Sequence, residues 1–369
     1  RFIAEGGGID LRPGDGVIHT MGNRFLLPYF VGTGGDSHTR FPIGISFPAG
    51  SDLVAFAASQ GYFPLDMPGS VRVRFKGKMQ PGITVRDLVN AIPYAALKTG
   101  KLNLEQGDKK INIFADCILE IQGLEYLTVE EAYKLTDASA ERSAAADTFA
   151  HSRDQVIAYV KNNLRFLTDN FARRHPSETV KKCIRLFEKW LEEPRLPEAD
   201  PDALYDQELE VNLDIITEPL LAAPNDPDKI VTLSEAAGTP IDEVFIGSCM
   251  VDITYFRGAS AILACETIPH YVKLWAVPPD RETNAQLARE GVLSSLMEAG
   301  ANIHVPGCSL CMGNQAQVAT NATVVSTSTR NFDNRMGIGA QVFLGSAYVA
   351  AVAALLGRIP TLEEYSNIV

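Results

Sequence analysis

The sequence lacks an apolar run long enough to cross a bilayer, and it has only six cysteines in 369 residues. Its most apolar stretch, residues 342–356, is interrupted by Gly345, Ser346 and Tyr348. That stretch is shorter than the roughly 18 to 20 apolar residues of a membrane-spanning helix, so we predict a buried helix there. Six unevenly spaced cysteines are too few for a disulfide-stapled secreted scaffold. We therefore expect thiol or metal chemistry in a reducing cytoplasm.

Positive charge is also scarce. Lys and Arg number 33 against 45 Asp and Glu, which gives a formal net charge of −12. This balance argues against nonspecific binding to nucleic acid or to anionic membranes and points to small-molecule ligands. The chain begins at Arg1 without a visible targeting segment, and we expect it to be a piece of a longer protein.

Strand-like runs followed by segments of helical period recur along the chain, which is typical of an α/β protein with mixed or parallel sheets. Thr84 is a plausible N-cap for a helix through Ile92. From Arg153 to Glu193 the pattern indicates a charged helical insertion, broken at His175 and without chemistry, and residues 194–228 predict a loop-dominated boundary. The other predicted strands are 71–76, 244–246, 272–277, 303–305 and 324–326, and the other predicted helices are 284–297 and 347–356.

Three cysteines follow predicted strands. Cys308 and Cys311 form a C-x-x-C turn after the strand that ends at residue 305, and Cys249 ends another strand. Parallel strands could deliver all three sulfurs to one sheet edge, where open α/β folds place their sites. The spacing alone leaves open a zinc site completed by His304, a redox disulfide and an iron–sulfur cluster with one open iron.

The remaining cysteines, Cys117, Cys183 and Cys265, lie in apolar or helical surroundings. We predict that they are buried small hydrophobic residues.

Several longer motifs occur in a fixed order. They are Gly-Val-Ile-His at 16–19, Gly-Asp-Ser-His-Thr at 35–39, Gly-Ser-Cys-Met at 247–250, Pro-Gly-Cys-Ser-Leu-Cys-Met-Gly-Asn-Gln at 306–315 and Ser-Thr-Ser-Thr-Arg-Asn-Phe at 326–332. Together they resemble the aconitase family, and in detail its bacterial B branch, along nearly the whole chain.

The resemblance implies three-layer α/β iron–sulfur domains with mixed or parallel sheets flanked by helices. Residues 1–70 would end the first domain, residues 71–215 would form the second with its helical insertion, and residues 216–369 would form the third with the cluster cysteines. An upstream swivelling domain and a helical-repeat domain would precede them in the full-length protein.

The resemblance also implies a hydro-lyase of the tricarboxylic acid cycle, an aconitate hydratase that converts citrate to isocitrate through cis-aconitate. A [4Fe-4S] cluster held by Cys249, Cys308 and Cys311 would act as a Lewis acid. The base, a serine of the swivelling domain, would be missing from this chain.

Site residues are carried over from the family's motifs. Ser37, Arg330 and Arg335 would bind substrate carboxylates, which guanidinium groups suit because they donate two parallel hydrogen bonds. The catalytic residues would be His19, Asp36, His38 and Glu141, arranged as carboxylate–histidine pairs.

Three positions are departures. The wider family has asparagine where this chain has Phe41 and Asp137, although proteins of the B branch share the aspartate. The B branch has asparagine where this chain has Asp252. An extra carboxylate near the cluster would disfavour its reduction. The alternatives within reach are hydration of 2-methyl-cis-aconitate and, for the cluster-free form, binding of mRNA.

Overall fold

A computed structural model describes residues 5–12 and 14–369 of the chain. These residues divide into two compact units, each made of separate chain segments. Unit 1 comprises residues 1–13, 18–75 and 114–208, and unit 2 comprises residues 14–17, 76–113 and 209–369. The three-domain division at 1–70, 71–215 and 216–369 follows the family pattern and stays a prediction. Arg1, on which the expected upstream continuation rests, lies outside the described residues.

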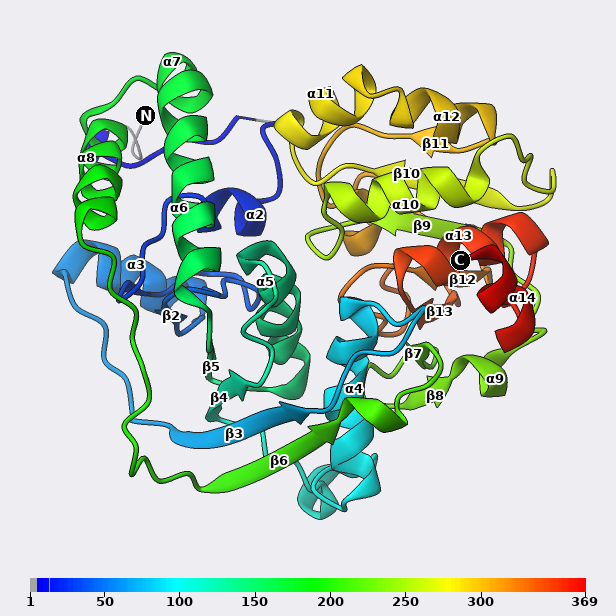
Figure 1. Ribbon diagram of the computed structural model, residues 1–369, viewed down its shortest axis with the longest axis horizontal. Helices are drawn as coiled ribbons and strands as arrows, with labels where there is room; N and C mark the ends of the chain where they lie inside the picture. The colour runs from blue at the N-terminus through cyan, green and yellow to red at the C-terminus, as the bar shows by residue number, and fades with distance from the viewer. Residues whose placement is uncertain (1–4, 13) are drawn as a thin grey trace. The chain divides into compact units, whose positions relative to one another are not determined.

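Unit 1 combines a small sheet with a helical segment. Its elements are α2 (Ile18–Asn23), β1 (Val31–Gly32), β2 (Ile45–Ser46), α3 (Ser51–Gln60), β3 (Gly69–Lys76), β4 (Cys117–Gln122), α5 (Val129–Ala138), the 3-10 helix η2 (Ser139–Arg142), β5 (Ala146–Phe149), α6 (Arg153–Phe166), the π-helical turn η3 (Leu167–Phe171), α7 (Ala172–Arg174) and α8 (Glu178–Glu192). Figure 1 shows α6 and α8 in green beside each other.

Strands β3, β4 and β5 are parallel neighbours, and β6 (Gln207–Asn212), where the chain passes into unit 2, completes the order β5-β4-β3-β6. In β3 the apolar Val71, Val73 and Phe75 are buried, whereas the alternate basic residues point outward. This confirms the strand predicted at 71–76, and the alternation follows because side chains of a strand point to the two faces of a sheet in turn.

The helical segment 153–192 has a function in packing that its charged surface conceals. Val156, Phe166, Phe171 and Phe187 are buried in one apolar cluster with Met21, which lies on α2. The break predicted at His175 is confirmed, because α7 ends at Arg174 and α8 begins at Glu178 after the N-cap Ser177. The insertion therefore supports the helix that carries His19.

Unit 2 contains a larger sheet covered by helices. Its elements are α4 (Val85–Lys98), η1 (Gly107–Lys109), η4 (Leu213–Ile215), β7 (Leu220–Ala222), β8 (Ile230–Thr232), α9 (Leu233–Ala236), β9 (Glu243–Gly247), α10 (Ile253–Leu263), β10 (Lys273–Val277), α11 (Arg281–Arg289), α12 (Val292–Glu298), β11 (Asn302–Ile303), η5 (Ser309–Met312), β12 (Thr323–Ser326), β13 (Gln341–Leu344), α13 (Ala347–Leu356) and α14 (Leu362–Ile368). Thr84 caps α4 as predicted, with a reciprocal capping box to Asp87.

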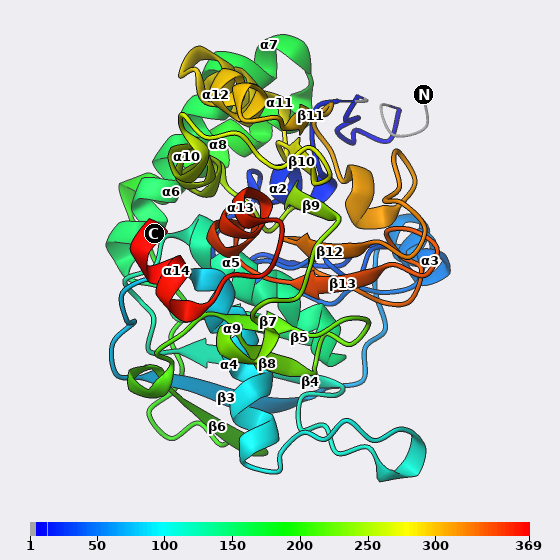
Figure 2. The ribbon, with the colours of Figure 1, turned by 90° about the vertical axis from the view of Figure 1, so that its right-hand side faces the viewer.

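The seven strands of unit 2 follow the order β11-β10-β9-β12-β13-β7-β8. The first five are parallel to one another, and β7 and β8 run antiparallel at one end. Every residue of the central strand β9 is buried, as expected for a strand with both faces covered. Figure 2 shows β12 and β13 side by side, which agrees with their parallel pairing. The predicted α/β class with parallel sheets is confirmed.

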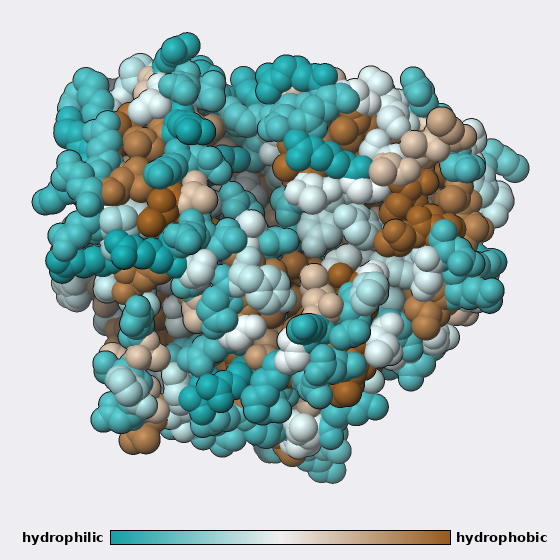
Figure 3. Space-filling view, viewed as in Figure 1, coloured by the Kyte–Doolittle hydropathy of each residue, from teal (hydrophilic) through white to brown (hydrophobic). Residues whose placement is uncertain are grey.

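The apolar stretch at 342–356 splits between β13 and α13. Ser346 caps α13, and most of that helix is buried against β9, β12 and α10, so the prediction of a buried helix is confirmed. Among the described helices, none is long and apolar enough to span a membrane. In Figure 3 apolar residues gather over α10 and α13, where partly buried side chains such as Ile262 and Leu355 continue the core to the surface.

Two local predictions were wrong. The helix predicted at 284–297 is two helices, α11 and α12, because Gly291 adopts a positive φ of 78° between them. The strand predicted at 303–305 ends at Ile303, and Val305 is exposed. The segment 194–228 is loop-dominated as predicted and contains the boundary between the two units, but it also includes β6, in which Leu209 and Val211 alternate inward.

Candidate active site

The parallel sheet of unit 2 has a switch point between β9 and β12. From β9 the chain adds β10 and β11 on one side, whereas the later strands β12 and β13 lie on the other. Ligands of open α/β sheets bind at the carboxyl ends of strands beside such a point. Cys249 follows β9 and Arg330 follows β12, so two predicted site residues lie at this position.

Cys249 is held by a short, constrained segment. The preceding Ser248 is fully buried and has a positive φ of 75°, a conformation that is strained for a residue with a side chain. The Gly247 N–H donates to Thr327 Oγ1 at 2.9 Å, which ties the end of β9 to the segment after β12. The Cys249 Sγ lies 3.7 Å from Thr329 Oγ1, next to Arg330 in the chain.

Cys308 and Cys311 share one turn, as their spacing predicted. The Cys311 N–H donates to the Cys308 carbonyl at 3.0 Å, and the turn ends at Gly313 with φ 65°. Ser309, between the two thiols, has a positive φ of 44°, and its N–H donates to Gln315 Oε1 at 2.8 Å. The backbone of the turn is thus defined by its own hydrogen bonds.

The cysteine turn touches the segment that carries the second arginine. A Cβ on Gly313 would lie 2.4 Å from the Arg335 carbonyl oxygen, so only glycine fits there. Asn331, between the two predicted arginines, is buried and donates from Nδ2 to the carbonyls of Ala223 and Val342 at 2.6 and 2.8 Å. The structure therefore brings Cys308, Cys311 and Arg335 to one edge of unit 2.

The two arginines differ in their surroundings. The Arg330 guanidinium lies 5.9 Å from the centre of the Phe332 ring. The Arg335 Nε is buried and has no hydrogen-bond partner in the structure. A buried donor without a partner is costly, so an anionic ligand accepting from Arg335 would be favoured here.

The predicted histidine–carboxylate pairs form in unit 1. His38 Nε2 lies 2.9 Å from Glu141 Oε1, and His19 Nε2 lies 3.2 Å from Asp36 Oδ1. His38 Nδ1 lies 3.6 Å from the same Asp36 oxygen, and the two imidazole rings meet edge to face at 5.8 Å. Contact with the imidazole of His19, and then of His38, holds the pKa of the Asp36 carboxyl well below its usual range.

His19 is positioned from behind by the helical insertion. The Tyr159 hydroxyl of α6 donates to the Asn23 carbonyl at 2.9 Å, and Asn23 Nδ2 donates to the His19 carbonyl at 3.0 Å. Both side chains are buried, and so is His19. This chain of contacts links the insertion to a predicted catalytic residue, which sequence reasoning did not anticipate.

Arg40 is a site residue that sequence reasoning missed, although it directly follows the Gly-Asp-Ser-His-Thr motif. Its buried guanidinium donates to the Ser37 carbonyl at 3.0 Å, to the Ala144 carbonyl at 2.9 Å and to Asp147 Oδ2 at 3.4 Å. The Ser139 hydroxyl donates to the same Asp147 oxygen at 2.6 Å. Arg40 therefore anchors the loop of Ser37 to the segment around β5.

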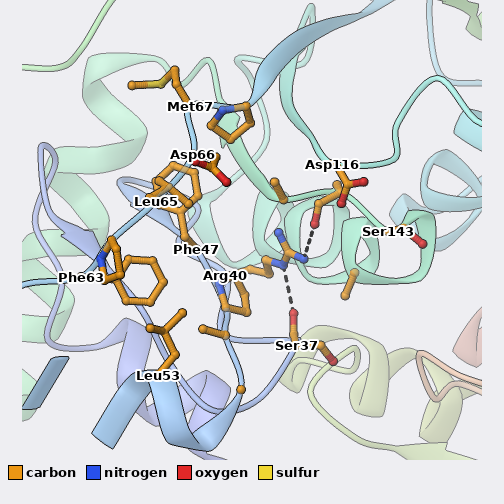
Figure 4. A pocket seen from close by; sticks show the side chains of 18 of the residues that line it. Ser37, Arg40, Phe47, Leu53, Phe63, Leu65, Asp66, Met67, Asp116 and Ser143 are labelled. Atoms are coloured by element: carbon orange, nitrogen blue, oxygen red, sulfur yellow. Dashed lines mark hydrogen bonds between the residues drawn. The ribbon is translucent and has the colours of Figure 1, made fainter. Parts of the chain in front are cut away.

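A pocket of about 790 Å³ opens in unit 1 beside Ser37 and Arg40. Figure 4 shows the aromatic and aliphatic side chains of Phe47, Leu53 and Phe63 along one side, with Arg40 bonded to Ser37 opposite them. The histidine pairs are not among the residues that line it. Ser37 thus lies in a predicted catalytic loop and also borders a hollow of mixed polar and apolar lining.

We predict that Asp147 makes stability depend on pH. Complete burial raises the pKa of Asp147 to about 7, with Arg40 and Ser139 opposing the shift. Because an unfolded aspartate titrates near 3.9, only the folded chain binds this proton between about pH 4 and pH 7, so this contribution to stability falls as the pH rises. The stability of the native chain relative to Asp147→Asn should therefore fall by up to about 4 kcal/mol across that window.

Urea denaturation at several pH values measures this difference, with the exposed Asp200→Asn as a matched control. Parallel pH curves for the native chain and Asp147→Asn would contradict the prediction.

The structure also assigns places to the departures from the family. Asp252 is the N-cap of α10 and accepts from the Thr254 and Tyr255 N–H groups, a role that asparagine fills equally well. The Tyr133 hydroxyl donates to the buried Asp137 at 2.8 Å. Phe41 packs against Gly32, where a Cβ would lie 2.6 Å from the ring.

The other cysteines are thiols without a disulfide, but one prediction for them was wrong. Cys265 is exposed, because it follows α10 with a positive φ of 64°. Cys117 and Cys183 are half-buried, and burial raises the pKa of both thiols, which disfavours the reactive thiolate.

A mononuclear zinc site is not supported. Thiolates on one tetrahedral zinc lie about 3.8 Å apart, given Zn–S bonds near 2.3 Å. In the described ranges, 5–12 and 14–369, no cysteine belongs to a set of three ligand atoms within 4.8 Å of one another. His304 instead packs its ring edge to face on Trp275 at 4.7 Å. The donor set of three cysteines fits a larger iron–sulfur cluster better than a single ion.

Comparison with known proteins identifies the family of the chain. The chain belongs to the aconitase family, whose family model (aconitate hydratase) matches residues 4–357. It is 58% identical over 369 residues to aconitate hydratase B of Salmonella typhimurium and 54% identical over 370 residues to that of Synechocystis, in both cases over 100% of this chain and 42% of the relative. It is 32% identical over 359 residues to the homoaconitase large subunit of Thermus thermophilus, over 95% of this chain and 76% of that relative. The chain thus spans less than half the length of the aconitate hydratase B relatives.

Proposed function

We propose that this chain is the cluster-binding part of an aconitate hydratase that interconverts citrate and isocitrate through cis-aconitate in the tricarboxylic acid cycle. One observation carries the proposal: three cysteines and two arginines lie at the carboxyl edge of one parallel sheet, at or beside its switch point. The identity to aconitate hydratase B relatives supports the substrate class.

Cys249, Cys308 and Cys311 would hold a [4Fe-4S] cluster. The fit is supported by the chemistry of the donor set, because thiolates are the usual ligands of iron–sulfur clusters and all three cysteines follow strands of one parallel sheet. When bound, the cluster supplies an iron with an open coordination position that acts as a Lewis acid.

Arg330, Arg335 and Ser37 would bind the substrate's carboxylates. A tricarboxylate carries about three negative charges, and guanidinium groups satisfy them with paired hydrogen bonds that also set orientation. The partnerless Nε of Arg335 is the donor best prepared for this role. Arg40 keeps the Ser37 loop in place through its hydrogen bond to the Ser37 carbonyl.

His38 would move the proton that accompanies the leaving hydroxide. The Glu141 carboxylate holds His38 Nε2 at 2.9 Å, which selects a tautomer and raises the basicity of the ring. His19 and Asp36 form the neighbouring pair and keep a fixed negative charge beside His38. The serine base expected from a swivelling domain would come from the part of the longer protein that this chain does not cover.

The experiment compares two proteins. One is this chain alone, and the other is a chimera in which this chain replaces the matched portion of Salmonella typhimurium aconitate hydratase B. After anaerobic reconstitution, we expect iron, sulfide and cluster absorbance in both proteins, but substantial citrate turnover only in the chimera. Little iron or sulfide in the reconstituted chain would sink the proposal, and robust turnover by the chain alone would refute the need for the remaining segments.

A second candidate substrate is a longer or methylated tricarboxylate, such as 2-methyl-cis-aconitate. The 32% identity to the homoaconitase large subunit favours testing it, because that relative is named for a homologous substrate. Ratios of kcat/KM in the chimera would decide between the substrates.

Binding of mRNA by the cluster-free form receives no support from the net charge of −12. The six thiols fit the cytoplasm as the site of action.

A further inference from the structure

Three side chains of unit 1 that could each bind a metal ion lie close together. His19, Asp36 and His38 each offer one ligand atom, and all three atoms lie within 4.8 Å of one another. Asp36 Oδ1 lies at the centre, 3.2 Å from His19 Nε2 and 3.6 Å from His38 Nδ1. We propose that these three side chains form a binding site for one divalent transition-metal ion, distinct from the iron–sulfur site of the cysteines.

The spacing of the three atoms suits a first-row ion. Imidazole nitrogens and carboxylate oxygens bind zinc at 2.0 to 2.2 Å, so neighbouring ligand atoms of a tetrahedral site lie about 3.3 to 3.6 Å apart. The two observed spacings are near that range, and an ion could therefore enter with small side-chain movements. Two histidines and one carboxylate leave further coordination positions open. Asp36 is partly exposed, so water could fill those positions.

A second carboxylate orients one of the ligands. Metal-bound histidine usually donates its other ring N–H to a carboxylate, which fixes the tautomer and raises the basicity of the ring. Glu141 Oε1 lies 2.9 Å from His38 Nε2, on the ring nitrogen that faces away from Asp36. This arrangement leaves His38 Nδ1 as the acceptor, which is the form that binds a metal ion.

His19 gives the independent observation. Its side chain is 6% exposed, and neither ring nitrogen has an aligned hydrogen-bond partner in the structure. A buried imidazole without aligned hydrogen bonds carries a desolvation cost that a metal ion at Nε2 would offset.

The ligand set defines the class of ion. Imidazole with carboxylate suits Zn²⁺, Co²⁺, Ni²⁺ and Fe²⁺ rather than Mg²⁺ or Ca²⁺, which prefer oxygen ligands alone. An ion bound here would occupy His38 Nδ1. If the proposed function holds, such an ion would inhibit turnover; the binding itself does not rest on that function.

The experiment titrates the chain with Co²⁺ under anaerobic conditions, following heat and absorbance. The same titration on a Cys249→Ser, Cys265→Ser, Cys308→Ser, Cys311→Ser variant removes the three proposed cluster ligands and the exposed thiol, all of which can bind cobalt. We expect about one ion per chain to remain in that variant, without thiolate charge-transfer absorbance. Asp36→Asn, which keeps the shape of the side chain, should abolish this binding, and Glu141→Gln should weaken it roughly 10- to 100-fold.

The exposed His270→Gln is the matched control and should bind Co²⁺ as the parent variant does. Circular dichroism shows whether each variant is folded, and His19→Gln serves as a second direct test. Equal stoichiometry and affinity in the parent, Asp36→Asn and His19→Gln would overturn the proposal. Because it uses no citrate and no cluster, this result is separate from the fate of the proposed function.

Discussion

Replacing Cys311 by serine should remove most of the iron and sulfide that the chain binds on anaerobic reconstitution. Cys311 is buried in the turn with Cys308, and a hydroxyl is a much poorer ligand for iron than a thiolate. Loss of a residue that only hydrogen-bonds to a metal ligand lowers metal affinity roughly 10- to 100-fold. Loss of a direct ligand should lower the affinity at least as much. Iron and sulfide quantification with a visible spectrum measures the effect.

Cys265→Ser is the matched control, because Cys265 is an exposed thiol outside the sheet edge. We expect it to bind iron and sulfide like the native chain. Cys249 follows β9 and lies outside the turn that carries Cys308 and Cys311. Cys249→Ser therefore tests whether this third sulfur binds the same cluster. A full cluster in either Cys249→Ser or Cys311→Ser would show that the ligands lie elsewhere.

Replacing His38 by glutamine should lower the kcat of the chimera for citrate by about 10²- to 10⁴-fold, the usual contribution of a general acid or base. The amide keeps a polar group near Glu141 but cannot carry a proton between substrate and solvent. Iron content should not change, because His38 is not among the proposed ligands of the cluster. Steady-state kinetics with iron quantification on the same samples measures both.

The control for this variant is again His270→Gln, which should leave kcat as it is. Glu141→Gln should also lower kcat, by less than His38→Gln, because it changes the tautomer and basicity of the ring without removing it. Native turnover in His38→Gln would exclude His38 as the proton carrier and would leave His19 as the candidate.

Much of the fold was predictable from local sequence because its causes are local. The Thr84 capping box, the alternation in β3 and the turn of Cys308 and Cys311 each depend on residues a few positions apart. The same locality explains an error. Gly291 lies inside the single helix that the sequence predicts at 284–297, because its neighbours continue the helical period and only its φ of 78° reveals the break.

The sequence alone determined which chemical groups this protein possesses: three thiols after strands, two arginines after an apolar strand, and histidines in a glycine-rich setting. Only the tertiary structure decided which groups meet. His38 contacts Glu141, which is 103 positions away in the sequence, and Arg40 contacts Asp147, which is 107 positions away. Such pairings depend on the packing of whole elements, because no local interaction selects between two distant carboxylates of equal charge.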